Sequence, residues 1–417
     1  MTFPRPQTVA GVLPAGLVLA ALLAAALLPT AGAHAEPARV ANGPAPADGT
    51  RDLELTELWR RGGLEDEDVI FGLITAVRTD ADGTVYVLDS QLSEIKVFTP
   101  DGELSEILGR EGDGPGEFRG PADMALLPDG TLGVLQAFPG RVVRLNRDGT
   151  EAGKWTLGDP AAGAFYIMRG LKTGGDVVVA GGTQQHIDQS QGLVRRETFL
   201  SSLGADGLRD VTYSSRTFEL KFQELRFDEK DIVDGADQRY DVGPDGRVVV
   251  AIPRNGYEVS VFAPDGTLER VFTREYDPWV RDARAEGIWR RIMEGIQAQQ
   301  PGQAPVSWEQ TEPDVENVRV AADGRTWILT SRGMWTPPAG VFARYDVFSP
   351  AGNFVEQVDV RCEGDPTSDV LIWAGPDRVL RVTGFWGAIL SRFGGGAGAG
   401  DDETEAEPMS IVCYEYR

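Results

Sequence analysis

Residues 73–109 read LITAVRTDADGTVYVLDSQLSEIKVFTPDGELSEILG, and residues 120–158 read GPADMALLPDGTLGVLQAFPGRVVRLNRDGTEAGKWTLG. Both stretches alternate apolar and polar residues, and both interrupt the alternation twice, at the same spacing, with an Asp-Gly pair. Asp-Gly between alternating residues is a strong signal for a β-hairpin, because glycine adopts the positive φ that such a tight turn needs. Each stretch therefore predicts four antiparallel strands, with hairpins at Asp82-Gly83, Asp101-Gly102, Asp129-Gly130 and Asp148-Gly149.

The same unit recurs along the chain with insertions. Further copies cover residues 166–211, 236–272, 316–360 and 368–417. The last copy lacks an outer strand, and the alternating segment 53–59, LELTELW, can supply it from the other end of the repeat array. Four-stranded units in radial repetition form a β-propeller. The sequence therefore predicts an all-β, six-bladed β-propeller over residues 52–417, closed by an N-terminal strand that completes the last blade.

The segment that joins the first two units carries a family resemblance. Residues 109–121 read GREGDGPGEFRGP and are followed by MALLPDGTLGVL, while the preceding unit contains DGTVYVLDSQLSEIKVF. Together these motifs resemble the NHL-repeat family and related bacterial six-bladed propellers. The resemblance implies a platform that binds proteins, peptides or carbohydrates. It also implies that a minority of relatives are lyases or lactonases with a metal in the central channel.

The N-terminal residues have the composition of a signal peptide. Arg5 precedes a nearly unbroken apolar run over residues 11–28, and Ala33-His34-Ala35 matches an A-x-A cleavage site. We expect residues 1–35 to be a signal peptide, with a retained membrane anchor as the alternative. We expect residues 36–51, rich in Ala, Pro and Gly, to form a flexible linker. The mature chain is then exported to the periplasm or the extracellular space, without insertion into a membrane.

The sequence has two cysteines, Cys362 and Cys413. Disulfides form and persist in oxidising compartments such as the periplasm. We therefore expect the two cysteines to be bonded to each other, with two buried free thiols as the alternative.

Composition excludes several classes of function. The 64 acidic residues against 40 basic ones give a net charge of −24, and there are 2 histidines. Affinity for phosphate groups comes from clustered Lys and Arg, so the charge argues against nucleic-acid partners and anionic membranes. The shortage of histidine argues against multi-histidine metal chemistry. We expect a monomer with no cofactor.

The two ends of the predicted ring differ. Hairpins within each unit lie at one end, and the longer connections lie at the other, where insertions occur at residues 181–196, 208–234, 273–312, 331–342 and 384–409. Loops held by a rigid scaffold carry function, so we place the working surface at this second end. Insertion 273–312, between the fourth and fifth blades, contains a predicted helix near 278–299 with Asp277 as N-cap and Pro278 in its first turn. Its apolar stripe predicts a lid packed over the rim.

Candidate site residues come from the innermost strands and from two loop tryptophans. Alternation places one set of polar side chains toward the channel: Arg78, Asp123, Arg239, Asp241, Asn317 and Arg319. These charges either pair with one another and fill the channel, or use their arginines to hold an anionic group. A Ca²⁺ site built from Asp123, Asp241 and Asn317 is a weaker alternative, because the nearby arginines oppose it. Trp335 and Trp386, at the insertion end, are candidate anchors for a ligand.

These patterns favour an exported, non-catalytic binding propeller that recognises a protein, peptide or carbohydrate on its loop-rich face. The alternative is a metal-dependent hydrolase, lactonase or lyase that uses a Ca²⁺-type site in the channel.

Overall fold

A computed structural model describes residues 36–66, 68–157, 164–232, 235–236, 238–298, 304–394 and 408–416. The predicted signal peptide lies outside these residues. The Asp-Gly pairs form tight turns as predicted, with Gly83 at φ 84° and Gly102 at φ 82°. In the described part of the chain, no helix is long and apolar enough to cross a membrane.

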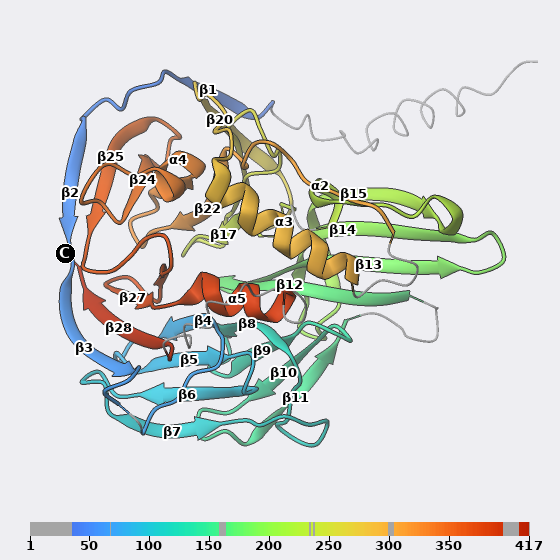
Figure 1. The fold of residues 1–417 in the computed structure, drawn as a ribbon, viewed down its shortest axis with the longest axis horizontal. Helices are drawn as coiled ribbons and strands as arrows, with labels where there is room; N and C mark the ends of the chain where they lie inside the picture. Colours follow the sequence, from blue (N-terminus) through green and yellow to red (C-terminus); the bar gives the residue numbers. More distant parts are fainter. Residues whose placement is uncertain are drawn as a thin grey trace, which may run out of the picture. The chain divides into compact units, whose positions relative to one another are not determined.

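Six sheets form a ring, which confirms the predicted six-bladed β-propeller (Figure 1). Their first strands are innermost, and hydrophobic residues are buried between adjacent blades. Blade 1 consists of β4 (Ile74–Thr79), β5 (Val85–Asp89), β6 (Glu94–Phe98) and β7 (Leu104–Leu108), and blade 2 of β8 (Pro121–Leu126), β9 (Leu132–Gln136), β10 (Arg141–Leu145) and β11 (Glu151–Thr156). Blade 3 consists of β12 (Ala164–Gly174), β13 (Val177–Asp188), β14 (Leu193–Leu203) and β15 (Arg209–Lys221), and blade 4 of β17 (Tyr240–Val242), β18 (Val248–Val250), β19 (Glu258–Phe262) and β20 (Leu268–Arg274). Blade 5 consists of β22 (Val315–Val320), β23 (Thr326–Thr330), β24 (Ala343–Phe348) and β25 (Phe354–Arg361), and blade 6 of β26 (Val370–Trp373), β27 (Arg378–Val382), β28 (Ser410–Glu415) and β3 (Thr56–Gly62).

Blade 6 closes the ring with an N-terminal strand, as predicted. β3 pairs antiparallel with β28, whereas Leu53 belongs to the preceding strand and lies on blade 5. Trp59 of β3 stacks on Phe98 with ring centroids 5.5 Å apart and donates its indole N–H to the carbonyl of Pro100 at 3.0 Å. The closing strand therefore also ties blade 6 to blade 1.

The segment expected to be a flexible linker, residues 36–51, contains one complete strand and the start of a second. β1 (Ala38–Asn42) adds in parallel to β20, and β2 (Thr50–Glu54) adds in parallel to β25, so blades 4 and 5 each have five strands. Asn42 donates its side-chain amide to the carbonyls of Thr273 and Gly352, at 2.9 and 3.0 Å. An extended segment without hydrophobic alternation is ordered here because the outer edges of two blades provide its backbone partners.

Blade 3 differs from the others in the length of its strands. β13, β14 and β15 extend well beyond the ring (Figure 1). The insertions expected at residues 181–196 and 208–234 are therefore largely strand rather than loop. Their backbone groups continue the ladders of the blade, with pairing from Val179↔Ser202 out to Asp188↔Leu193.

The predicted helix exists but begins later than expected. α3 spans Ala283–Ala298, and Asp282 caps it by accepting the N–H of Ala285 at 2.9 Å. Asp277 is therefore not the N-cap, because the residues after it run extended and Val280 pairs with Thr311. The remaining regular elements are the helices α2 (Glu229–Ile232), α4 (Ser331–Trp335) and α5 (Phe385–Gly394), the 3₁₀ turn η3 (Phe222–Glu224), and the short strands β16 (Phe227–Asp228) and β21 (Val306–Ser307).

The two cysteines are free thiols, which contradicts the expected disulfide. Cys413 packs on the blade 1 side of the blade 6 sheet, with Val77 and Leu380. Cys362 packs on the opposite side of that sheet, with Val412 and Tyr414. The sheet of blade 6 thus separates the two sulfur atoms. Burial raises the pKa of each thiol to about 12, so both are protonated at neutral pH.

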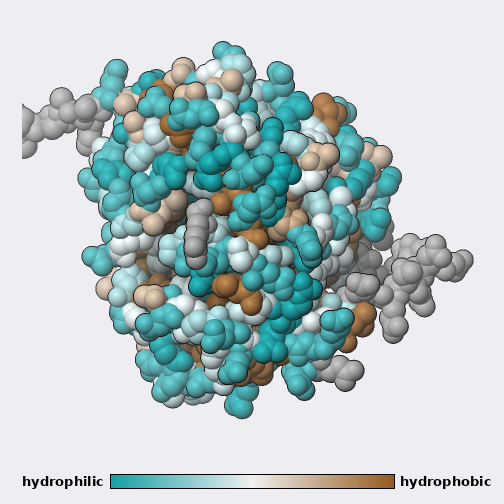
Figure 2. All heavy atoms as spheres, turned by 90° about the vertical axis from the view of Figure 1, so that its left-hand side faces the viewer, coloured by the Kyte–Doolittle hydropathy of each residue, from teal (hydrophilic) through white to brown (hydrophobic). Residues whose placement is uncertain are grey.

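One side of the ring is strongly hydrophilic (Figure 2). Figure 2 shows the side of the ring that carries β2 and β3, where hydrophilic residues predominate and hydrophobic ones are scattered. This distribution fits the net charge of −24.

Candidate functional site

Three helices lie across one end of the ring and form a lid, defined here as α3, α4 and α5 (Figure 1). Ile288 and Ile292 of α3 pack against Trp279 and Trp335. The rings of Trp279 and Trp335 stack with centroids 5.8 Å apart, and Trp386 of α5 lies 5.7 Å from Trp335. The two predicted tryptophans therefore come together inside the lid. Trp335 is 7% exposed, so its main contacts are with the lid itself.

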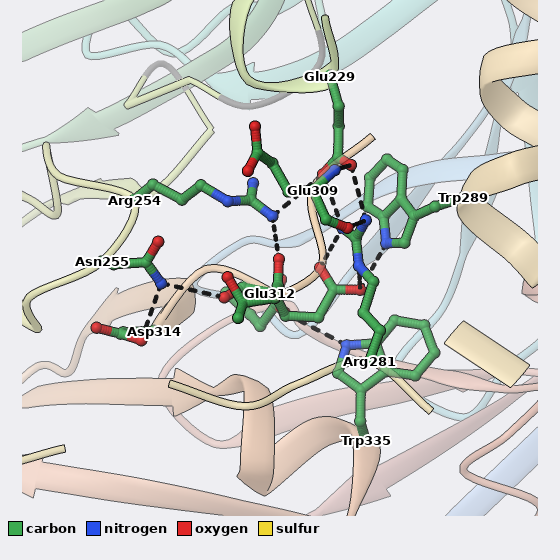
Figure 3. Close-up of polar contacts among 11 residues, drawn as sticks. Glu229, Arg254, Asn255, Arg281, Trp289, Glu309, Glu312, Asp314 and Trp335 are labelled. Atoms are coloured by element: carbon green, nitrogen blue, oxygen red, sulfur yellow. Dashed lines mark hydrogen bonds and ion pairs between the residues drawn. The ribbon is translucent and has the colours of Figure 1, made fainter. Parts of the chain in front are cut away.

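A buried ion-pair network lies beneath the lid (Figure 3). The guanidinium of Arg281 donates to both carboxylate oxygens of Glu229, each at 2.7 Å, and to both of Glu312, each at 2.9 Å. The side chains of both glutamates are 0% exposed, and that of Arg281 is 2% exposed. Trp289 of α3 donates its indole N–H to Glu312. One arginine therefore joins α2, the start of the insertion and its end.

Arg254 and Asp314 extend the network toward blade 4. Arg254 lies 3.2 Å from Glu229 and donates to the carbonyl of Thr311. Asp314 accepts the backbone N–H groups of Gly256 at 2.6 Å and Tyr257 at 3.1 Å. The loop after β18 is thereby fixed against the segment that leads into blade 5.

Glu316 lies at the start of β22, and its pKa departs strongly from the ordinary value of 4.5. Its carboxylate accepts the indole N–H of Trp335 at 3.3 Å. Burial raises the pKa of Glu316 to about 8, and the charge of Glu312 adds to this effect, while Arg239 and Arg254 oppose it. Burial likewise raises the pKa of Glu312 against the opposing effect of Arg281. Glu316 therefore holds its proton more tightly than an ordinary carboxyl group does, below a lid tryptophan.

The predicted channel residues tie neighbouring blades together. Arg78 of blade 1 pairs with Asp123 of blade 2 at 2.9 Å, and Asp123 also accepts the N–H of Leu171 in blade 3 at 2.8 Å. Asp241 of blade 4 lies 3.7 Å from Lys172 of blade 3 and accepts the N–H of Val320 in blade 5 at 2.7 Å. The two carboxylates considered for Ca²⁺ are thus each held by a cation and a backbone amide.

Three other predicted residues have different surroundings. Arg319 lies over Trp327, Trp373 and Tyr416, with its guanidinium carbon 4.3 Å from the Trp373 ring centroid. Arg239 is 4% exposed, and its Nε donates to the carbonyl of Ala251 at 3.3 Å. Asn317 pairs with Leu329 in the ladder between β22 and β23. Arg239 acts electrostatically on Glu316, and the contacts described here do not join the six predicted residues into one cluster.

The buried network was missed at the sequence level. Glu229, Arg281 and Glu312 lie in insertions without a repeat, and neither hydrophobic period nor turn spacing marks them. The one available signal was the group of acidic residues between Glu309 and Glu316 immediately before an innermost strand. No three His, Cys, Asp or Glu side chains in the described ranges are arranged to hold a metal ion.

At this end of the ring, buried ion pairs join the lid to the segments beneath it. Arg281 and Arg254 together offset the charges of Glu229 and Glu312, and removal of Arg281 or of a glutamate would leave a buried charge without its full set of partners. Glu316 offers a proton donor or acceptor beside the aromatic lid. The arrangement can hold the lid in one position and can respond to a ligand or a proton that changes this charge balance.

No family model and no curated protein matches the chain. Solved structures similar to it include a protein from Bacteroides fragilis NCTC 9343 that is provisionally described as exported, with 10% identity, a TM-score of 0.46, and 91% of this chain and 99% of that one covered. Virginiamycin B lyase from Staphylococcus aureus shows 9% identity and a TM-score of 0.41, over 87% and 99% of the two chains. Regucalcin, a calcium-binding protein from Agrobacterium tumefaciens, shows 10% identity and a TM-score of 0.39, over 89% and 96%. The resemblance to the NHL-repeat family stays a prediction.

Proposed function

We propose that this chain is an exported, non-catalytic binding protein that recognises a protein, peptide or carbohydrate with its lid-bearing face. The observation that carries the proposal is the placement of the lid and of the buried network on the same end of the propeller. Rigid scaffolds commonly present their binding elements in this way. Export rests on the sequence of residues 1–35.

The exposed side of α3 favours a ligand with acidic groups. Arg290 and Arg291 are exposed on this helix, and neither has a hydrogen-bond or ion-pair partner among the described residues. On a chain with a net charge of −24, these two adjacent guanidinium groups offer free donors to an acidic group, beside the exposed Glu286 and Glu294 of the same helix. A partner that carries carboxylate, sulfate or similar groups would be attracted to the lid and repelled by most of the remaining surface.

Binding to arrays of acidic oligosaccharides and acidic peptides tests this proposal. The labelled full chain is applied to both arrays, and any ligand found is titrated by calorimetry. We expect the double variant Arg290→Glu/Arg291→Glu to weaken binding by about tenfold or more. Arg147→Glu, on the hairpin end, is the matched control and should leave the affinity unchanged.

Three results would count against the proposal. If the lid variant and the control lose the same amount of affinity, the ligand binds elsewhere or the effect is non-specific. If nothing binds on either array, the proposal loses its support. Chemical turnover of the bound ligand, especially turnover that requires added Ca²⁺, would favour the metal-dependent enzyme instead.

A further inference from the structure

The outer edge of blade 2 differs from those of blades 4 and 5. In blades 4 and 5 the outermost strand does not end the sheet, because β1 and β2 add to it in parallel. Blade 2 has no such addition: no described segment pairs with the outer edge of β11. The molecule itself thus shows that an outer blade edge of this type accepts an extended segment.

The register of the occupied edges identifies the equivalent positions in β11. The N–H of Gln357 in β25 donates to the carbonyl of Gly49 at 2.9 Å. Gln357 follows its hairpin glycine, Gly352, at the same distance as Lys154 follows Gly149. Lys154 is therefore the blade 2 residue whose backbone corresponds to a strand-accepting position.

Hydrogen bonding within blade 2 agrees with this assignment. The N–H of Leu157 donates to the carbonyl of Gly140 at 3.2 Å, so the backbone N–H of Leu157 points toward β10. Inward and outward backbone groups alternate along an antiparallel strand. The amides of Lys154 and Thr156 therefore point to the open edge.

Two adjoining cavities lie beside these positions, with volumes of about 250 and 190 Å³, and both are lined by Arg141 and Lys154. The first has a mixed polar and apolar lining that includes Asp113, Glu117 and Glu151. The second is mostly apolar, has no carboxylate in its lining, and is formed by Pro139, Gly140, Arg141, Lys154, Thr156, Leu157, Ala164, Phe165 and Tyr166. Cavities next to an open edge provide places for side chains of an added strand.

The lining specifies the chemistry of the added strand. Lys154 is exposed, and its ammonium has no partner among the described residues, so it suits an acidic side chain on the added strand. Beyond Thr156, the rings of Phe165 and Phe138 meet edge to face at 5.7 Å, and Phe138 is 58% exposed. This end suits an aromatic side chain.

We propose that the outer edge of β11 binds an extended peptide of another protein, which adds in parallel and carries the motif acidic–x–aromatic. The acidic residue lies opposite Lys154 and the aromatic residue opposite Thr156, because side chains on one face of a strand repeat every second residue. In this parallel register the middle residue donates its N–H to the carbonyl of Lys154, and Thr156 donates its N–H to the middle residue's carbonyl.

Fluorescence anisotropy with the full chain tests the proposal. The probe is a labelled, capped peptide with Glu-Val-Phe at its centre, and it should bind saturably with one peptide per chain. A peptide methylated on the nitrogen of its central Val loses the bond to Lys154 and should bind about tenfold more weakly or worse. A peptide with the order Phe-Val-Glu should lose affinity by a similar factor, because the acidic and aromatic side chains then face the wrong positions.

Variants of the protein test the same contacts from the other side. Thr156→Pro removes an outward N–H that β10 does not use, so it should keep the melting temperature and weaken the peptide about tenfold. Ile107→Pro places a proline in β7 of blade 1, at the position that corresponds to Lys154, and should leave the affinity unchanged. Lys154→Glu should weaken the Glu-Val-Phe peptide and favour a Lys-Val-Phe peptide.

Three outcomes would overturn the proposal. The first is the absence of saturable binding to the Glu-Val-Phe peptide. The second is binding that is insensitive both to the methylated nitrogen and to Thr156→Pro. The third is equal affinity for the reversed peptide.

Discussion

The two ends of the propeller satisfy their charges in different ways. At the hairpin end, Asp129 accepts the N–H and the hydroxyl of Thr131, at 3.0 and 2.6 Å, only two positions along the chain. At the lid end, Arg281 reaches Glu229 and Glu312, which come from segments far apart in sequence. The hairpin end is therefore a series of local turns, and loss of the contacts in one turn should not destabilise the others. The lid end is one cooperative junction in which a single lost partner affects three segments.

The largest effect of this difference is expected for Arg281→Met. The variant removes the cation that both buried carboxylates share, leaving Glu312 without one and Glu229 with Arg254 alone. Breaking a buried pair in this way costs about 3–5 kcal/mol of unfolding free energy. Denaturant unfolding followed by circular dichroism measures the loss. Arg290→Met, on the exposed side of the lid, is the control and should change stability by about 0.5 kcal/mol or less. Equal stability of the two variants would show that the network does not hold the lid.

At the hairpin end, we expect a large effect only where a turn touches another blade. A Cβ added at Gly102 would lie 2.4 Å from Cγ of Trp59, and the backbone there has a φ of +82°. Gly102→Ala should therefore cost about 2–4 kcal/mol, from strain and overpacking together. Gly130 has a φ of +87° but no atom within 4 Å of the added Cβ, so Gly130→Ala should cost only about 1 kcal/mol.

Thermal denaturation of the two alanine variants provides the measurement. Similar melting temperatures would show that backbone strain alone decides the cost. In that case the contact between the closing strand and the turn of blade 1 would contribute little.

The sequence predicts well those structural features that depend on residues close together in the chain. The Asp-Gly pairs at residues 82–83 and 101–102 specify hairpins through glycine's positive φ, and their equal spacing specifies the blades. The same alternation predicted the channel set and pairing among its charges as one of two alternatives, but not which residues pair, because Arg78 and Asp123 come from different blades. Residues 38–42 looked like linker because their order comes from the edge of β20 and not from their own pattern.

The candidate site was missed for a related reason. Glu229, Arg281 and Glu312 have no local signature, and only the folded ring brings their segments together. The start of α3 was misplaced because Pro278 and Asp277 are a good helix start in isolation. In the structure, the residues after them form a bridge with the far end of the insertion, and Asp282 takes the capping role.

A pH-dependent effect, smaller within any one pH unit than the two above, is expected at Glu316. The carboxyl titrates near its ordinary pKa of 4.5 in the unfolded chain and at about 8 when folded. Between these values the folded state keeps a proton that the unfolded state has released. The Glu316 contribution to stability is therefore complete in acid and falls as pH rises, by at most about 1.4 kcal/mol per pH unit, until about pH 8.

The non-titrating variant Glu316→Gln isolates this effect. The difference in unfolding free energy between Glu316→Gln and the natural chain should grow in favour of the variant from pH 5 to pH 8. A difference that stays constant with pH would mean that Glu316 is ionised throughout this range in the folded protein.

The smallest effect is expected for an aspartate at the hairpin end, and its pH dependence has the opposite sign. The hydroxyl of Thr131 is the main cause that lowers the pKa of Asp129 from its ordinary 3.8, and Arg144 contributes. Its contribution is therefore present above that value and is lost as the pH falls below it. Because the carboxylate is exposed, solvent screens these interactions, and Asp129→Ala should cost about 1 kcal/mol or less at neutral pH. Thermal melts at pH 7 and pH 3 measure both values: the variant should melt below the natural chain at pH 7 and close to it at pH 3. A cost as large as that of Arg281→Met would mean that the hairpin end is as cooperative as the lid end.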